Sequence, residues 1–343
     1  MNAPFLKKIL RFAVENNASD VHFSSGLPPV LRILGEIKKV DMEPVSEESL
    51  SKELLEILNE KQKQLFHLHR EIDMAVSIGD LGRFRVNIYR QFNGVSAAFR
   101  IVKSRVSSLD ELNLPVVLKK MVNHRKGLIL VTGPTGSGKS TTLAAMLHEI
   151  NLNRREHIIT IEDPIEYLHT PVQSIIHQRE VGVHTENFAQ ALRSALREDP
   201  DVILVGEMRD LETITYALRA AETGHLVLST VHTNSAGETI DRIINVFPSQ
   251  QQDQIRMMLA NTFISVISQR LVPMAMKQDR VAVMEILIAT NAVRNLIREG
   301  KSFQLDSAIQ TGAEFGMQTF ERSLSYLRQN NFVSPQIQLS DVI

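Results

Sequence analysis

The chain contains no cysteine, and aromatic side chains make up only 5 % of its 343 residues. Without cysteine, the protein forms neither disulfide bonds nor zinc or iron–sulfur sites held by thiolates. This composition suits a reducing compartment. The scarcity of aromatic residues argues against a channel for single-stranded nucleic acid, because such channels combine basic grooves with aromatic stacking platforms.

The chain also lacks an excess of charge of either sign and lacks long apolar runs. The formal net charge is −1, so the chain has no general basic excess that would attract nucleic acid or an anionic membrane. No apolar run approaches the roughly 18 residues of a membrane-spanning helix. The segment 1–10 carries two lysines among its apolar positions, unlike the core of a signal peptide. We therefore expect a soluble cytoplasmic protein that binds no nucleic acid.

The segment 133–141 is the most informative motif, because it matches the phosphate-loop pattern G-x-x-x-x-G-K-[ST] at every fixed position. An apolar segment before it, 127–132, is predicted to be a buried strand, and 140–151 is predicted to be a helix. Glycines let backbone N–H groups curl around a phosphate, and a helix N-terminus favours negative charge. The predicted nucleotide-binding residues are Gly133, Pro134, Thr135, Gly136, Ser137, Gly138, Lys139, Ser140 and Thr141.

Two side chains of this loop have specific expected roles. Lys139 would reach the β- and γ-phosphates, and the hydroxyl of Ser140 would ligate Mg²⁺. The alternative is a turn rich in glycine and serine that arose by chance. The order of strand, loop and helix argues against that alternative.

The first hundred residues are predicted to form a small α+β domain, 1–102. Ser46 can cap a helix, and Asn93-Gly94 is a strong hairpin signal between two strands. The polar, charged segment 103–115 is predicted to connect two domains. The expected elements are helices at about 3–16 and 46–58, strands at 19–24, 83–90 and 95–102, and further strands set off by Pro28-Pro29 and Gly35.

From residue 116 to the end, strands and helices alternate, which predicts an α/β sheet covered on both faces. The segment 254–271 has an apolar face with helical spacing, and about the last 50 residues are also expected to be helical. The remaining expected strands are 157–162, 173–177, 201–206 and 225–230, and the remaining expected helices are 186–198, 210–222 and 235–245.

Acidic residues follow two of these strands. Ligands gather at the carboxyl ends of strands in sheets of this kind, so Glu207 can act beside Mg²⁺ or orient the attacking water. Glu162 and Glu166 belong to a second acidic group, in which carboxylates repel one another unless a cation lies nearby. The alternatives are a surface acid for Glu207 and an acidic turn at Asp163-Pro164 for the second group.

Histidines and arginines supply further candidates. His225 and His232 flank one apolar strand, are seven residues apart and therefore project to opposite faces. Arg83 and Arg85 share one face of a predicted strand, and Arg100 lies on its hairpin partner. Guanidinium groups suit the charge of a transferring phosphate. Satisfied loop or core histidines and a solvated strand face are the alternatives.

Taken together, these motifs resemble the secretion and type IV pilus motor ATPases, specifically their pilus-retraction branch. The resemblance rests on the phosphate loop, on the acidic motifs 160–166 and 204–210, on the histidine motif 224–233 and on the segment 292–299. It extends over nearly the whole chain. The resemblance implies that the segment 292–299 matters for retraction rather than for hydrolysis. The alternative is an ordinary amphipathic helix, in which Val293, Leu296 and Ile297 form an apolar face while the arginines and Glu299 point outward.

The resemblance implies a RecA-like phosphate-loop ATPase domain preceded by a PAS-like domain. It implies a homo-hexameric ring that uses ATP and Mg²⁺ and works on an inner-membrane pilus platform protein, at the cytoplasmic face of the inner membrane. Glu207 would be the general base, with Glu162 and Glu166 supporting metal and water, and Ser140, Glu207 and Glu162 close to the metal. Two further roles are implied, nucleotide sensing by His225 and His232 and an arginine finger from Arg83, Arg85 or Arg100.

Four other functions are open at this point. A pilus-assembly or type II secretion motor would usually have a longer N-terminal region and often a four-cysteine zinc module, and this chain is expected to have neither. An accessory retraction ATPase is a closer alternative. A DNA translocase would show DNA-stimulated, salt-dependent hydrolysis, and a noncatalytic nucleotide sensor would show no turnover.

Overall fold

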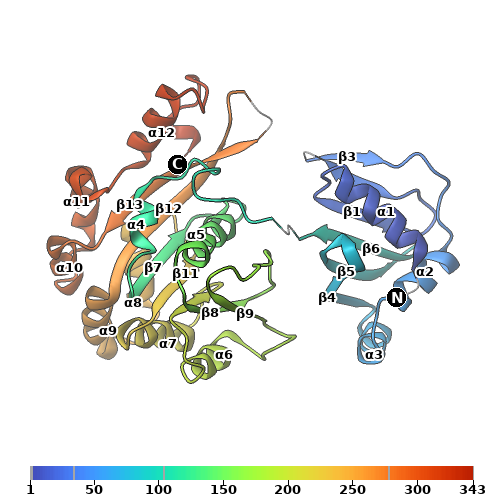
Figure 1. The fold of residues 1–343 in the computed structure, drawn as a ribbon, viewed down its shortest axis with the longest axis horizontal. Coiled ribbons are helices and arrows are strands. Elements are labelled where there is room, and N and C mark those ends of the chain that lie inside the picture. Colours follow the sequence, from blue (N-terminus) through green and yellow to red (C-terminus); the bar gives the residue numbers. More distant parts are fainter. Residues whose placement is uncertain (1–2, 34, 103–104, 277–278, 343) are drawn as a thin grey trace. The chain divides into compact units, whose positions relative to one another are not determined.

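The computed structural model describes residues 3–33, 35–102, 105–276 and 279–342, and the chain divides into two compact units, 1–105 and 106–343 (Figure 1). Each unit has a hydrophobic core of its own. In the described part of the chain, no helix combines the length and apolar content that a bilayer crossing requires.

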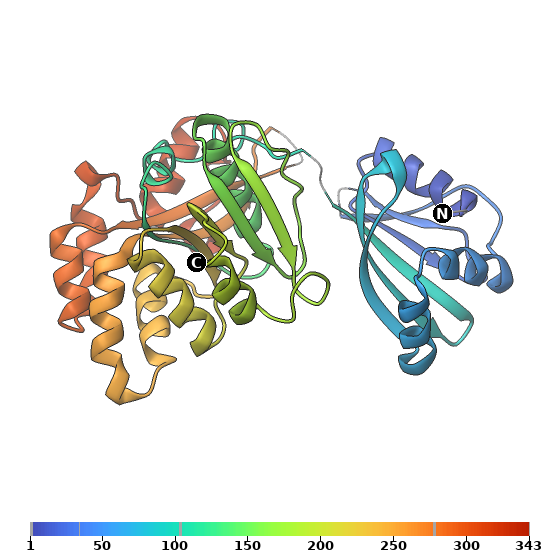
Figure 2. The ribbon, with the colours of Figure 1, turned by 60° about the horizontal axis from the view of Figure 1, so that its bottom comes forward.

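The first unit is a six-stranded antiparallel sheet with helices packed against it, which confirms the expected α+β class (Figure 2). The strand order is β3-β2-β1-β6-β5-β4. Phe23, Phe84 and Phe99 are fully buried and pack edge to face in its core. Its elements are α1 (Pro4–Glu15), β1 (Asp20–Ser24), β2 (Val30–Ile33), β3 (Glu36–Lys39), α2 (Glu47–Glu56), α3 (Glu60–His69), β4 (Glu71–Ser77), β5 (Arg83–Gln91) and β6 (Gly94–Ile101).

Local signals in this unit were informative where they were strong. The side chain of Ser46 accepts a hydrogen bond from the Ser49 backbone N–H, as expected for a helix cap. The hairpin at Asn93-Gly94 is present, and Gly94 has a φ of 116° that favours glycine. Helix α3 and strand β4 were not predicted, because their short apolar patterns are weak.

Most of the predicted connection 103–115 falls within the second compact unit, which begins at residue 106. Residues 103 and 104 lie outside the described part of the chain. Leu109 and Leu114 are buried among residues of the second unit, including Leu118 of α4 (Val117–Met121). Leu109 and Leu114, with partly buried Leu112 packed against the same core, therefore anchor 106–115 to the second unit.

The second unit is a seven-stranded sheet in the order β13-β12-β7-β11-β10-β8-β9, and only β13 runs antiparallel to its neighbour. Its elements before the C-terminal region are β7 (Gly127–Thr132), α5 (Lys139–Asn153), β8 (His157–Glu162), β9 (Ile175–Glu180), α6 (Phe188–Ala195), β10 (Val202–Val205), α7 (Leu211–Glu222), β11 (Leu226–Val231), α8 (Ala236–Asn245), α9 (Ser249–Thr262), β12 (Phe263–Pro273) and β13 (Arg280–Ile288).

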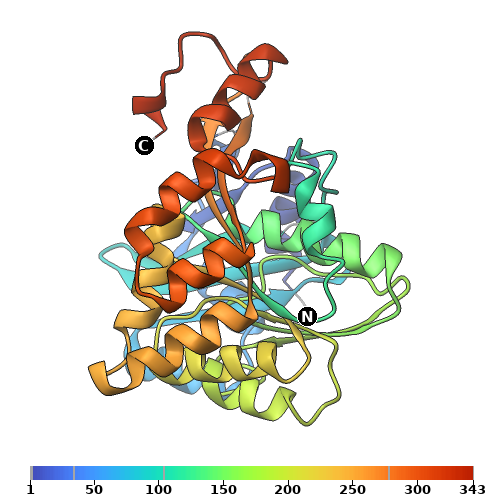
Figure 3. The same cartoon turned by 90° about the vertical axis from the view of Figure 1, so that its left-hand side faces the viewer.

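Helices cover both faces of this sheet, which confirms the predicted α/β class. One face packs against α4 and α5, and the other packs against α6 to α10 (Figure 3). Alternate residues of β7 show the division, since Leu128 and Leu130 belong to one core while Ile129 and Val131 belong to the other. Central parallel strands buried on both faces explain the continuous apolar runs in the sequence.

The prediction of a single helical segment over 254–271 is wrong. Helix α9 ends at Thr262, and β12 begins at Phe263, pairing with β7 on one side and β13 on the other. Ile264, Val266 and Ile267 are β-branched and are more favourable on a pleated surface than their helical spacing suggests. Pairing within the sheet thus overrides the local helical pattern.

The C-terminal region is mostly helical, as expected, with α10 (Asn291–Arg298), α11 (Leu305–Thr311) and α12 (Phe320–Gln329). Val293 and Ile297 are buried, as predicted. The alternative of an ordinary amphipathic helix has both arginines pointing outward, but the guanidinium of Arg294 donates to the backbone carbonyls of Ala260 and Asn261. A cation at the end of α9 satisfies carbonyls that the helix leaves unpaired.

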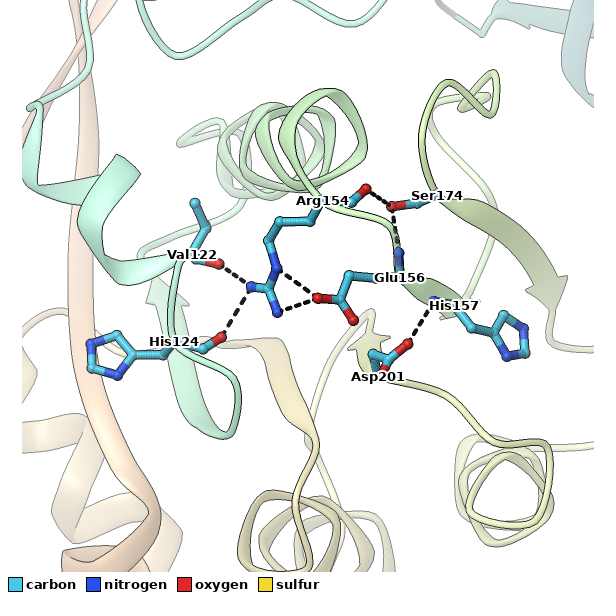
Figure 4. Close-up of polar contacts among 7 residues, drawn as sticks. All are labelled: Val122, His124, Arg154, Glu156, His157, Ser174 and Asp201. Carbon is cyan, nitrogen blue, oxygen red and sulfur yellow. Dashed lines mark hydrogen bonds and ion pairs between the residues drawn. The ribbon is translucent and has the colours of Figure 1, made fainter.

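At the amino ends of the strands, one arginine ties three chain segments together (Figure 4). Arg154 pairs with Glu156 at 2.9 Å and donates to the backbone carbonyls of Val122 and His124 at 2.5 and 3.0 Å. The hydroxyl of Ser174 donates to the Arg154 carbonyl. The end of α5 is therefore fixed to the segment that leads into β7.

Candidate functional site

A cavity of about 370 Å³ lies at the carboxyl ends of the central parallel strands of the second unit. Strands β7, β8, β10 and β11 point the same way, so the loops that follow them meet at one edge of the sheet. The predicted site residues that line the cavity are Thr135, Gly136, Gly138, Lys139, Ser140, Thr141, Glu162, Glu166, Glu207 and His232.

The phosphate loop follows β7 and leads directly into α5. Gly133 and Gly138 have φ values of 141° and 85°, which few other residues adopt. A Cβ at Gly133 would collide with the backbone oxygen of Gln269, and a Cβ at Gly138 would lie 2.9 Å from the Gln269 Nε2. These two glycines are required both by conformation and by the close approach of β12.

Lys139 is the first residue of α5 and is only 8 % exposed. Its Nζ donates to the backbone oxygens of Gly133 and Pro134, each at 2.9 Å. Burial lowers the pKa of Lys139, and the carboxylates of Glu166 and Glu207 oppose that shift. Lys139 is thus the positive charge that a group of neighbouring carboxylates needs close by.

Glu207 is held between two basic side chains just beyond β10. Its Oε1 lies 2.6 Å from the Nε of Arg209, and its Oε2 lies 3.5 Å from the Nε2 of His232. The turn itself is fixed because the hydroxyl of Thr230 donates to the Gly206 carbonyl at 2.6 Å. The carboxylate therefore has a defined direction within the cavity.

His232 lies just after β11, beside the turn that carries Glu207. Burial lowers its pKa, the charge of Lys139 lowers it further, and Glu207 opposes the shift. The imidazole is therefore neutral at neutral pH and offers one N–H donor and one acceptor nitrogen.

Glu162 ends β8 and faces the same cavity. Its Oε1 accepts hydrogen bonds from the Thr160 hydroxyl at 2.6 Å and the Gln178 Nε2 at 3.1 Å. Burial raises the pKa of Glu162, the two hydrogen bonds oppose that rise, and the charge of Glu166 adds to it. The two carboxylates are thus electrostatically coupled.

The donor set of the cavity fits Mg²⁺. Within the described ranges, no three histidine, aspartate or glutamate side chains form a metal-binding group. Mg²⁺ does not need such a group, since it commonly takes one or two protein oxygens and completes its shell with phosphates and water. Ser140, Glu162 and Glu207 line one cavity and could provide these oxygens.

Four of the predicted site residues belong neither to the phosphate loop nor to the lining of the cavity. His225 precedes β11 at the opposite end from His232, and its Nδ1 lies 2.9 Å from the Ala220 backbone oxygen. The three arginines belong to the first unit, where Arg85 and Arg100 are directly opposite each other on β5 and β6. Arg100 pairs with Asp20 at 3.0 Å, while Arg83 belongs to the same strand as Arg85.

Sequence reasoning missed several residues around the site. Thr160 and Arg209 are each two positions from a predicted glutamate, a spacing that places side chains on one side of an extended chain and could have identified them. Gln178 and Gln269 reach the site from β9 and β12, which pair with β8 and β7. Their contacts depend on strand order, which no local pattern specifies.

The family model described as type II/IV secretion system protein matches residues 2–322. The chain belongs to this family. A Pseudomonas aeruginosa relative named type IV pilus retraction ATPase PilT is 48 % identical over 329 residues, which are 96 % of this chain and 95 % of the relative. A Neisseria gonorrhoeae relative named twitching motility protein is 47 % identical and covers 90 % of this chain and 82 % of its own length.

A solved structure supports the fold. The crystal structure of the pilus retraction motor PilT with bound ADP has a TM-score of 0.89 to this chain at 46 % identity, covering 97 % of this chain and 94 % of the other. This match confirms the expected α/β architecture, with an ATPase domain preceded by a smaller domain.

Proposed function

We propose that this chain is an ATPase whose hydrolysis of ATP drives retraction of a type IV pilus. The observation that carries the proposal is the 48 % identity to a pilus retraction ATPase over nearly the full length of both chains. A cavity that combines an intact phosphate loop with Glu207 supports the ATPase activity independently.

The first step is binding of the triphosphate. Backbone N–H groups of the loop and of the first turn of α5 surround the phosphates, and Lys139 supplies positive charge. Ser140, with Glu162 or Glu207 nearby, would hold Mg²⁺, which would supply neutralisation of charge on the phosphate oxygens. Burial lowers the pKa of Lys139, and the charges of Glu166 and Glu207 oppose that shift.

The second step is activation of water. Glu207 accepts a proton from the attacking water or orients it, because its carboxylate is fixed by Arg209 and lies beside neutral His232. Loss of the γ-phosphate changes the charge facing His232 and Arg209. We assign to His232 the role of reporting this change to β11 and α8.

The remaining parts of the proposal rest on the sequence resemblance. The working unit is a homo-hexamer, and Arg83, Arg85 or Arg100 is the arginine finger. His225 contributes to nucleotide sensing through the segment between α7 and β11. The motor acts on an inner-membrane platform protein at the cytoplasmic face of that membrane, and nucleic acid is not its substrate.

The decisive experiment is fluorescence imaging of labelled pili in host cells that lack this gene. Many long pili that extend but never shorten support retraction, and complementation with the unaltered gene should restore shortening. Cells without pili would instead indicate an assembly motor. Normal pili with failing secretion or DNA handling would overturn the pilus assignment and leave the ATPase chemistry in place.

A further inference from the structure

Strand β12 places three consecutive polar residues beside the nucleotide site. Ser268 accepts a hydrogen bond from the Thr132 hydroxyl at 3.0 Å, and the Nη2 of Arg270 donates to Asn234 Oδ1 at 2.8 Å. Gln269 lies between them and is only 1 % exposed. This short segment therefore contacts both the end of β7 and the segment just after His232.

The side chain of Gln269 bridges two parts of the phosphate-binding element. Its Nε2 donates to the backbone oxygen of Ser137 at 2.5 Å, and its Oε1 accepts from the Thr142 hydroxyl at 2.7 Å. Ser137 belongs to the loop, and Thr142 belongs to the first turn of α5. The donor and the acceptor of the buried amide therefore both form hydrogen bonds with the phosphate-binding element.

Gln269 also restricts the loop sterically, through its backbone carbonyl and through its side chain. Its carbonyl oxygen leaves no room for a Cβ at Gly133, where the loop begins, and its Nε2 leaves little room at Gly138, where α5 begins. A single residue of β12 therefore contacts the loop at its start, at Ser137 and at the start of the helix.

We propose that Gln269 is a positioning residue that holds the phosphate loop in its nucleotide-binding conformation. The amide supplies the required donor and acceptor together. A carboxylate has no donor for the Ser137 carbonyl, and an apolar side chain leaves two buried polar groups unsatisfied. The inference rests on the proposed binding of ATP at this loop.

The first test compares Gln269→Met with Gln318→Met, which removes a similar hydrogen bond to the Met284 carbonyl in a part of the second unit outside the cavity. Affinity for Mg·ADP is measured with a fluorescent analogue, and stability is measured by urea unfolding. We expect Gln269→Met to weaken binding about 10-fold, or about 1.4 kcal/mol, and Gln318→Met to change it less than about 2-fold.

Two outcomes would overturn the inference or its basis. If both variants lose stability and neither changes the affinity of the folded protein, Gln269 is only a core residue. If the unaltered protein does not bind Mg·ADP, the proposed function fails first, and this inference fails with it. The first outcome leaves the proposed function standing, so the two failures are distinguishable.

Gln269→Glu adds a rescue test that a purely structural role does not predict. At about pH 8 the introduced carboxylate faces the Ser137 carbonyl without a proton, whereas at about pH 5.5 a buried carboxyl can be protonated and donate. We define the deficit as the factor by which a variant binds Mg·ADP more weakly than the unaltered protein does at the same pH. For Gln269→Glu this deficit should shrink about 5-fold or more as the pH falls from about 8 to about 5.5. The deficit of Gln269→Met should stay constant, and a constant deficit in both would contradict the proposal.

A double-mutant cycle with Thr142→Val tests the bridge itself. Both substitutions remove the same hydrogen bond, so their effects on ADP affinity should be markedly less than additive. Full additivity would show that Gln269 and Thr142 act independently, which would remove the bridging role. Thr142→Val keeps the shape of the side chain, so the cycle does not depend on a disruptive change.

Discussion

Glu207 is the residue that we propose activates the attacking water. Arg209 and His232 define the position of its two oxygens, while the phosphate loop is built from other residues. We expect Glu207→Gln to bind ATP with affinity within about 3-fold of the unaltered protein and to hydrolyse it at least about 10-fold more slowly, about 1.4 kcal/mol in the barrier. Steady-state phosphate release and nucleotide titration measure the two effects.

A control for this experiment is Glu222→Gln, which removes an exposed carboxylate at the end of α7. It should leave turnover unchanged. Near-normal hydrolysis by Glu207→Gln would show that another group activates the water, and Glu162 would then be the next candidate.

His169 gives the site a predictable dependence on acid. It lines the cavity, and burial together with the charge of His148 lowers its pKa to about 4. An unfolded histidine titrates near about 6.5, so between these values the unfolded chain binds a proton that the folded chain does not. Stability should therefore fall as pH drops from about 6.5 to 4, by up to about 3 kcal/mol.

The corresponding measurement is urea unfolding of the unaltered protein and of His169→Gln at several pH values. His169→Gln should reduce the acid-side slope, whereas exposed His124→Gln should retain it. Equal slopes in all three proteins would mean that His169 does not contribute to the acid sensitivity.

At the scale of elements, Arg154 connects the end of α5 to the segments before β7 and β8. Arg154→Met would leave the Glu156 carboxylate, whose side chain is 20 % exposed, without its partner. Removing one member of such a pair typically costs about 3–5 kcal/mol when it is buried. We expect a loss of about 3 kcal/mol in the unfolding of the second unit.

Arg155→Met is the matched control, because Arg155 is adjacent in sequence and exposed. Its effect should stay within about 0.5 kcal/mol. Equal, small effects of the two substitutions would show that the ion pair in Figure 4 contributes little to stability.

Strand β12 shows why element type was only partly predictable. Its residues have a helical apolar spacing, yet they form the strand between β7 and β13. In contrast, the central strands and α5 were predicted because long apolar runs and the phosphate-loop motif specify them locally. Short apolar segments depend on which neighbours are available, so their type is decided by pairing.

At the scale of the whole molecule, the chain has two units with separate cores, and the candidate arginine fingers belong to the first. An arginine finger stabilises transition-state charge and typically changes turnover by about 10³-fold or more. We expect Arg83→Met, Arg85→Met or Arg100→Met to reduce turnover at least about 10-fold while ADP affinity changes less than about 3-fold.

Arg90→Met is the control, since Arg90 is exposed on the same strand as Arg85. Turnover and ADP affinity are measured for all four variants. If no substitution at the three candidate positions lowers turnover more than Arg90→Met does, the first unit does not supply a catalytic arginine.

The phosphate loop, the acids after β8 and β10, the α/β class and the family resemblance were all determined by the sequence itself. They depend on local chemistry, namely glycines that admit unusual backbone angles, a lysine and a serine at fixed spacing, and buried strands that must be apolar on both faces. These constraints act within a few residues and are visible without a structure.

Only the tertiary structure decided which distant residues support that local motif. It placed His232 in the same cavity as the phosphate loop, and it brought Gln178 to Glu162 and Gln269 to that loop. The physical reason is strand order, because it is set by the packing of the whole sheet rather than by any single segment.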